Sequence, residues 1–171
     1  MPNESAVLQQ IRQSAAELEG WSSLCRPLTS SSAGVHLAVL IEPYLGYILQ
    51  HKKTVESRFS KNCIAPFQRI NAGDLVLLKA TAGPVVGCFT AAWVNCMELD
   101  AERLAEVRTT YAEAICADAA FWHTRAGKRY VTLVGVDQPC RLPPVRVAKS
   151  DRRGWIVLRA STQAEAQLSL L

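Results

Sequence analysis

The sequence predicts an α+β fold: a small β-barrel of about five to six strands, with flanking helices and a helical appendage at the N-terminus. Short apolar segments typical of β-strands recur along the chain, separated by turn-forming residues, and few helical segments stand between them. In addition, 49% of the 171 residues are hydrophobic and 20% are charged, which is enough to form a buried core. This composition excludes an intrinsically disordered, collagen-like or low-complexity chain.

The expected elements follow one another in a simple order. An amphipathic helix at 5–24 has apolar residues at spacings of three and four, and a linker rich in Ser, Pro and Gly follows at 26–34. Further helices are expected at 43–50, where Pro43 suits the first turn, and at 98–125. The short apolar strands are expected at 35–41, 54–58, 75–79, 85–94, 129–136 and 155–158. This arrangement favours a barrel over a parallel sheet.

The elements divide the chain into three parts. Residues 1–34 are the N-terminal helix and linker, residues 35–160 the main domain, and residues 161–171 a C-terminal tail. Within the main domain we expect a loop at 59–72 and an irregular crossing at 139–144. The apolar runs fall well short of the ~20 residues that cross a bilayer, and the first residues lack the features of a secretory signal. We therefore expect no membrane association and a cytoplasmic location.

The cysteines and histidines do not suggest a metal site. The six cysteines are at least eight positions apart, and most lie inside apolar stretches. We therefore expect reduced, buried thiols rather than a zinc site. His36, His51 and His123 also lack the spacing of metal ligands. No metal and no cofactor is predicted.

Charged residues are unevenly distributed along the chain, whose net charge is +4. Residues 51–69 contain five bases and one acid, residues 141–159 contain six bases and one acid, and residues 98–118 contain six acids and two bases. Two basic blocks indicate a positive face that suits a partner carrying phosphate or carboxylate groups. The alternative is that these charges only coat solvated loops.

Three residues in the first basic block form a distinctive cluster. Glu56 and Arg58 are two apart on a predicted strand, so their side chains point to the same side, and Lys53 is expected at the mouth of the same surface. A carboxylate between two cations stays ionised, and the cations keep donors for a phosphate, a carbonyl or a base edge. The alternative is a structural ion pair between Glu56 and Arg58 beside a solvated Lys53.

The segment 42–58, EPYLGYILQHKKTVESR, resembles the signature of ASCH domains, a branch of the PUA-like β-barrel superfamily. In that family a strand ends in a Pro-aromatic pair, a helix follows, and a Gly-x-Lys-x-x-Glu-x-Arg motif runs into the next strand. Lys53, Glu56 and Arg58 match the motif, and His51 replaces its Gly. A helix end often needs a left-handed residue, and His is enriched there among non-Gly types. The resemblance covers about residues 36–159 and implies a small PUA-like barrel.

The resemblance also implies a function, because PUA-like domains commonly bind RNA. Our leading hypothesis is an ASCH-like protein that binds RNA or a nucleotide-like small molecule in a cleft next to the Lys-x-x-Glu-x-Arg motif. Basic residues suit phosphates, and tyrosines suit stacking on an unpaired base, although a place in the core is the alternative for each tyrosine. The candidate ligand-binding residues are Lys52, Lys53, Glu56, Arg58, Tyr44, Lys61, Arg129 and Tyr130.

Two other functions remain open. One small ASCH-like branch resembles amidohydrolases that act on N4-acylated cytidine through the motif Lys; if this chain is such an enzyme, Lys53 and Glu56 are the catalytic candidates, and a ribonuclease is a less favoured enzyme. Glu56 stabilises the ammonium form of Lys53, which opposes nucleophilic use unless burial outweighs it. The other function is a protein-interaction module whose N-terminal helix docks a partner. The oligomeric state is not predicted.

Overall fold

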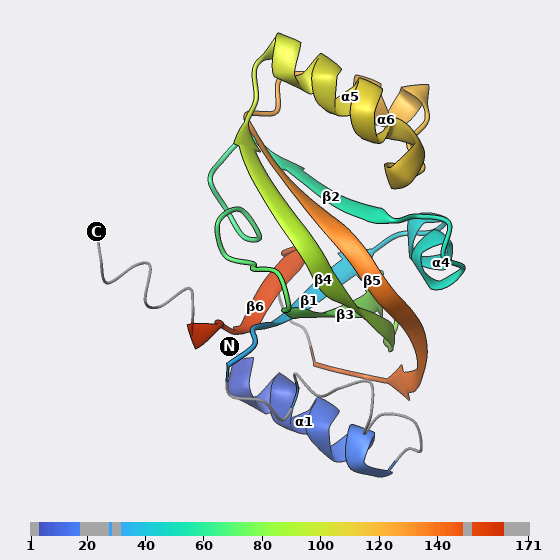
Figure 1. Ribbon diagram of the computed structural model, residues 1–171. Helices are drawn as coiled ribbons and strands as arrows, with labels where there is room; N and C mark the ends of the chain where they lie inside the picture. Colours follow the sequence, from blue (N-terminus) through green and yellow to red (C-terminus); the bar gives the residue numbers. More distant parts are fainter. Residues whose placement is uncertain (1–3, 18–27, 29–31, 149–151, 163–171) are drawn as a thin grey trace.

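The computed structural model describes residues 4–17, 28, 32–148 and 152–162 (Figure 1). Its elements, in chain order, are α1 (Glu4–Glu17), β1 (Val35–Leu40), α4 (Tyr44–Leu49), β2 (Val55–Ser60), β3 (Leu75–Ala80), β4 (Val85–Glu98), α5 (Ala101–Ile115), α6 (Ala119–His123), β5 (Tyr130–Val145) and β6 (Trp155–Arg159). The strands form one curled sheet with helices at both of its ends, which confirms the α+β barrel. None of the described helices is long and apolar enough to cross a membrane.

The order of strands in the sheet is β2-β5-β4-β3-β1-β6. β1 and β3 run parallel, and all other neighbours are antiparallel, so the sheet is mixed. β2 and β6 are the two edges and do not pair with each other. The wall of the barrel is therefore open along a seam between β2 and β6.

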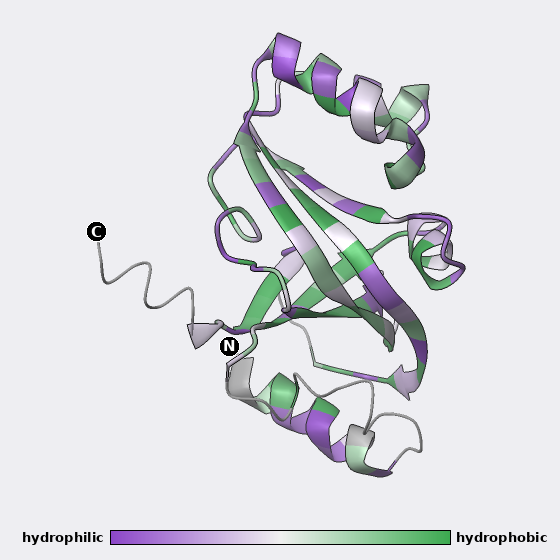
Figure 2. Cartoon of the chain, in the orientation of Figure 1, coloured by the Kyte–Doolittle hydropathy of each residue, from purple (hydrophilic) through white to green (hydrophobic). Residues whose placement is uncertain are grey.

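Apolar residues are frequent on the strands of the sheet (Figure 2), and a continuous run of buried apolar residues is typical of a strand covered on both faces. Four consecutive residues of β3, from Leu75 to Leu78, are fully buried. One core cluster lies where α1 packs onto the barrel through Val7, Leu8 and Ile11. A second lies beneath α4, and a third joins β2 and β5 to α5 and α6. As Figure 1 shows, α1 and α5 cover opposite ends of the sheet.

β5 differs from its prediction, because it continues to Val145 through the expected irregular crossing at 139–144. The pairing of β4 with β5 shifts register on both sides of the Cys88–Cys140 pair. Such bulges tolerate residues that cannot donate to the ladder, which explains why the prolines of this segment do not end the strand. β4 likewise runs on to Glu98, past the predicted end at 94.

The helix predicted at 98–125 is instead two helices. α5 ends at Ile115, and its C-cap residue Cys116 adopts a left-handed conformation with φ 60°. Asp118 then caps α6 by accepting a hydrogen bond from the Phe121 N–H. A left-handed residue ends a helix because its backbone turns away from the helix axis. His51, after α4, also has a positive φ, 61°, as the comparison with the motif glycine predicted.

The N-terminal prediction is tested in part. The helix runs over Glu4–Glu17, whereas residues 18–24 of the predicted helix, most of the predicted linker and residues 163–171 of the predicted tail lie outside the described residues. Of the five described cysteines only Cys88 is buried as expected, whereas Cys96, Cys116 and Cys140 are partly buried and Cys63 is exposed in the turn after β2.

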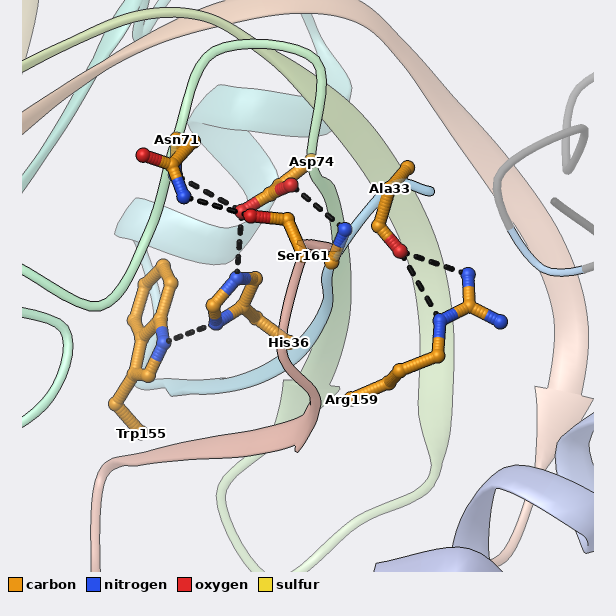
Figure 3. A network of polar contacts seen from close by, with 8 residues as sticks. Ala33, His36, Asn71, Asp74, Trp155, Arg159 and Ser161 are labelled. Atoms are coloured by element: carbon orange, nitrogen blue, oxygen red, sulfur yellow. Dashed lines mark hydrogen bonds and ion pairs between the residues drawn. The ribbon is translucent and has the colours of Figure 1, made fainter. Parts of the chain in front are cut away.

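Asp74 ties the start of β1 and β3 to β6 (Figure 3). Its carboxylate accepts hydrogen bonds from the backbone N–H groups of Gly34 and Asn71, at 2.7 Å and 2.8 Å, and contacts His36 Nε2 at 3.1 Å. The indole of Trp155 donates to His36 Nδ1 at 3.2 Å. Because an indole only donates, Nδ1 accepts, and the proton on Nε2 points to Asp74. The buried polar groups of this region are thereby satisfied.

Replacing Asp74 by alanine should destabilise the fold. The Asp74→Ala variant leaves the donors of Gly34, Asn71 and His36 without their acceptor, and each buried unsatisfied donor costs about 1–3 kcal/mol. We expect the free energy of unfolding, measured with urea, to fall by about 3 kcal/mol or more. The exposed control, Asp137→Ala, should change it by less than about 0.5 kcal/mol. Equal effects of the two substitutions would contradict the role of Asp74.

Candidate ligand-binding site

The motif residues on β2 form a buried charge cluster. Arg58 Nε donates to Glu56 Oε1 at 2.7 Å, and the other carboxylate oxygen of Glu56 lies 3.5 Å from Lys53 Nζ. The Glu56 residue is only 3% exposed. The predicted arrangement of one carboxylate between two cations, with Glu56 and Arg58 on one side of the strand, is confirmed.

Lys53 lies beneath the surface rather than at its mouth. The residue is 2% exposed, and its Nζ donates to the backbone carbonyl of Ile115 at the end of α5, at 3.0 Å. A cation is favourable at the C-terminus of a helix, where carbonyls lack intrahelical partners. Burial lowers the pKa of Lys53 from its ordinary value, and the nearby Glu56 carboxylate only partly opposes this effect. Burial therefore outweighs the ion pair.

Arg58 crosses the seam between the two edges of the sheet. One terminal nitrogen of its guanidinium donates to the carbonyl of Gly154, just before β6, and the other to the carbonyl of Val39 in β1, both at 3.1 Å. The guanidinium also packs 5.2 Å from the ring centroid of Trp155. A guanidinium has five N–H donors. Three of them donate to Glu56, Gly154 and Val39, and the other two have no acceptor among the residues that the structure describes.

A pocket of about 180 Å³ opens in the seam beside Arg58. Its walls are about equally polar and apolar. The Thr132 hydroxyl, which also lines the pocket, accepts a contact from the Cys96 thiol. The lining residues are Arg58, Phe59, Ser60, Ile64, Ala65, Pro66, Phe67, Thr132, Gly154 and Trp155.

Two of the predicted cations lie next to this pocket. Lys61 directly follows Ser60, which lines the pocket, and Arg129 N–H donates to the Ser60 carbonyl at 2.9 Å. Both cationic residues are exposed. Tyr130 packs edge-on against Phe67, with ring centroids 5.0 Å apart, and so supports the pocket wall from behind. The structure therefore brings Arg58, Lys61 and Arg129 to one end of β2.

The remaining predicted residues lie toward the other end of β2, near Lys53. Tyr44 is half-buried and packs against Phe121 of α6 with ring centroids 5.9 Å apart, and burial raises its pKa. The Lys53 ammonium lies 5.6 Å from the Tyr44 ring centroid, and the exposed Lys52 lies 5.8 Å from that of Tyr47. These residues do not line the pocket described above.

The second basic block is divided by the fold. Arg152 is exposed and lies two positions before Gly154, which lines the pocket, so its backbone is near the pocket. Arg159 instead donates to the carbonyl of Ala33, which gives it a structural role. Arg141 pairs with Gly87 near the far end of β5. Lys149, also part of this block, lies outside the described residues.

The sequence did not single out several residues that the fold places at the site. Thr132 is the direct partner of Arg58 across β2 and β5, and Phe67 comes from the loop after β2. No local pattern marks either residue, because their positions depend on strand register. Arg125 lies beside the motif, with its guanidinium 4.0 Å from the Phe121 ring centroid, and burial lowers its pKa. The sequence predicted only that Arg125 lies at the end of a helix.

Comparisons with known proteins support the fold. The ASCH protein of Zymomonas mobilis superposes with a TM-score of 0.59 at 14% sequence identity, covering 80% of this chain and 94% of that one. A serine-to-alanine variant of that protein superposes with a TM-score of 0.60 at 13% sequence identity, covering 82% of this chain and 98% of that one. A tyrosine-to-phenylalanine variant superposes with a TM-score of 0.58 at 14% sequence identity, covering 80% of this chain and 97% of that one. The sequence itself matches no family model and no curated protein. The chain thus has the fold of an ASCH domain.

The lowered pKa of Lys53 predicts a change in stability at alkaline pH. Between the lowered pKa of Lys53 in the folded protein and pH 10.5, the Lys53 side chain is protonated in the unfolded chain but deprotonated in the folded protein. Because the unfolded state binds more protons in this pH range, Lys53 makes the free energy of unfolding rise with pH. The free energy of unfolding of the wild type minus that of Lys53→Met should therefore increase as pH approaches 10.5 from below. The exposed neighbour provides the control, Lys52→Met, against which the effect at the buried position is compared. A flat difference for Lys53→Met in urea unfolding would contradict the lowered pKa.

Proposed function

We propose that the protein binds RNA or a nucleotide-like ligand, with one unpaired base or a similar planar group in the pocket beside Arg58. The observation that carries the proposal is the position of this pocket. It lies in the open seam of the barrel, and a residue of the Lys53–Glu56–Arg58 motif forms part of its wall. The function expected beside this motif therefore has a suitable cavity there.

The chemistry of the pocket suits a nucleobase. A base has flat apolar faces and a polar edge, and the pocket combines apolar walls at Ile64 and Phe67 with the donors of Arg58 and Thr132. Arginine is well suited to carbonyl and ring-nitrogen acceptors of a base edge. A cavity of about 180 Å³ is below the range of about 300–1,000 Å³ typical of drug-sized ligands. This size favours a single ring system over a whole nucleotide.

The surroundings of the pocket suit a phosphate backbone. Lys61, Arg129 and Arg152 are exposed near the residues that line it. Cations at the rim neutralise phosphates, and a base enters a pocket only when it is unpaired and unstacked. We therefore favour single-stranded RNA over a duplex.

The rim cations give the first test. Fluorescence anisotropy of a labelled single-stranded RNA at several salt concentrations should show weaker binding for Lys61→Gln and for Arg129→Gln. Each variant should lower the slope of log affinity against log salt by about 0.7, the value for one phosphate contact on a single strand. Arg141→Gln removes an exposed arginine near the far end of β5 and should leave the slope unchanged. Equal effects at all three positions would contradict a rim at this pocket.

The pocket itself is tested with an abasic oligonucleotide of the same length and charge. Stacking of a base on protein side chains is worth about 1–3 kcal/mol, so the abasic strand should bind roughly 5- to 150-fold more weakly. Ile64→Glu, which places a carboxylate at the exposed rim of the pocket, should reduce this preference for the base. A protein that binds both strands equally, or that binds neither at low salt, would refute the proposal.

An amidohydrolase acting on N4-acylated cytidine is a second candidate, favoured by one observation. Burial lowers the pKa of Lys53, so the neutral, nucleophilic form of its amine is more populated than it is for a lysine in water. However, Lys53 Nζ is hydrogen-bonded to the Ile115 carbonyl in a nearly inaccessible position, so a substrate reaches it only if the end of α5 moves. The geometry therefore favours binding over catalysis.

Incubation with N4-acetylcytidine, followed by chromatography, distinguishes this second candidate. If it is correct, the wild type and Arg141→Gln release cytidine at equal rates, and Lys53→Met releases none. A wild-type rate equal to that of buffer removes this substrate.

A further inference from the structure

Two cysteines face each other across β4 and β5, outside the pocket. Cys88 and Cys140 are direct partners in the antiparallel ladder, and their sulfur atoms are 3.4 Å apart. Opposite residues in such a pair have Cβ atoms about 4.5–5.5 Å apart, and a disulfide requires about 3.5–4.5 Å. A small displacement is therefore enough to bring the two sulfurs to bonding distance.

The backbone around this pair allows such a displacement. A Cβ atom added at Gly87 would lie only 2.7 Å from the carbonyl oxygen of Cys140, so the absence of a side chain lets the two strands approach closely. The register shifts between Val85 and Gly87 and again between Cys88 and Thr90. Bulges on both sides interrupt the regular ladder, which leaves the strands between them less constrained.

The two thiols differ in access to solvent. Cys88 is 2% exposed and belongs to the core cluster on which α1 packs, whereas Cys140 lies half-buried at the margin of that cluster. The pKa of Cys140 is lowered to about 7, chiefly because the Cys88 thiol hydrogen-bonds to its sulfur. The reactive thiolate form of Cys140 is therefore more populated than that of an ordinary cysteine. Because Cys140 is the more exposed of the two residues, we expect a small reagent to react with Cys140 before Cys88.

We propose that Cys140 and Cys88 are a peroxide-sensitive thiol pair, in which a hydroperoxide oxidises Cys140 and Cys88 then closes a reversible intrachain disulfide. This modification site is independent of the proposed ligand pocket, because neither cysteine lines that pocket.

The chemistry takes place in two steps. The Cys140 thiolate attacks the terminal oxygen of the hydroperoxide, the O–O bond breaks, and the departing alkoxide or hydroxide takes up a proton, which leaves Cys140 as a sulfenic acid. Cys88 then gives up its proton and attacks the Cys140 sulfur, and the S–O bond breaks as the hydroxyl leaves with that proton as water. Two thiols lose two electrons, and the hydroperoxide is reduced to an alcohol, or to water when the oxidant is hydrogen peroxide.

Hydrogen peroxide added to the reduced wild-type protein tests the proposal without any substitution. Peptide mapping by mass spectrometry should find the Cys88 and Cys140 peptides linked, with the mass of two hydrogens lost, and dithiothreitol should restore both thiols. The exposed cysteine provides a matched control: Cys63→Ser should keep this linkage. Cys140→Ser should abolish it and leave Cys88 reduced.

A second variant tests the order of the two steps. In Cys88→Ser the hydroxyl can still donate to the Cys140 sulfur, but the sulfenic acid has no resolving thiol, so dimedone should label Cys140 far more than in the wild type. Three results would overturn the proposal. The first is oxidation of Cys63 while Cys88 and Cys140 remain alkylatable, the second is linkage of either residue to another cysteine, and the third is dimedone labelling of Cys140 that does not depend on Cys88.

Discussion

The contact of Arg58 with both edges of the sheet is the constraint on which the barrel and its pocket depend. An unpaired strand edge exposes backbone groups, and this sheet has two such edges, β2 and β6, facing each other across the seam. Arg58 reaches carbonyls on β1 and before β6, while Glu56 fixes the direction of its guanidinium. A lysine cannot hold three acceptors in this planar geometry. The same side chain therefore joins the edges and shapes the pocket between them.

Lys53 connects this seam to the helices that follow β4. A buried ammonium is costly unless it is paired and hydrogen-bonded, and Lys53 has both Glu56 and the Ile115 carbonyl as partners. The next residue strengthens the link, because the Thr54 N–H donates to the Ala114 carbonyl at 2.9 Å. The end of α5 is thus fixed against the start of β2 by polar contacts, with the apolar contacts of the third core cluster around them.

Local patterns predicted the parts of the site that depend on neighbouring residues. The alternation of a strand placed Glu56 and Arg58 on one side, and the motif predicted the left-handed conformation of His51. The burial of Lys53 could not be predicted, because its carbonyl partner is 62 positions away, at a helix end that no Gly or Pro marks. Thr132 meets Arg58 only because of the register of β2 with β5. Sequence patterns thus predicted the motif, and long-range pairing determined its surroundings.

The same limit applies to the charge blocks, because a block in the sequence need not be a patch on the surface. Arg129 and Arg141 bracket most of β5 and are twelve residues apart, which corresponds to about 40 Å along an extended strand. The ligand proposed for the seam would therefore lie near the cations at the pocket end of that strand and far from those at the end covered by α1. Arg58 and Arg159 are also engaged with backbone carbonyls. The basic surface available at the pocket is therefore local and is formed chiefly by Lys61, Arg129 and Arg152.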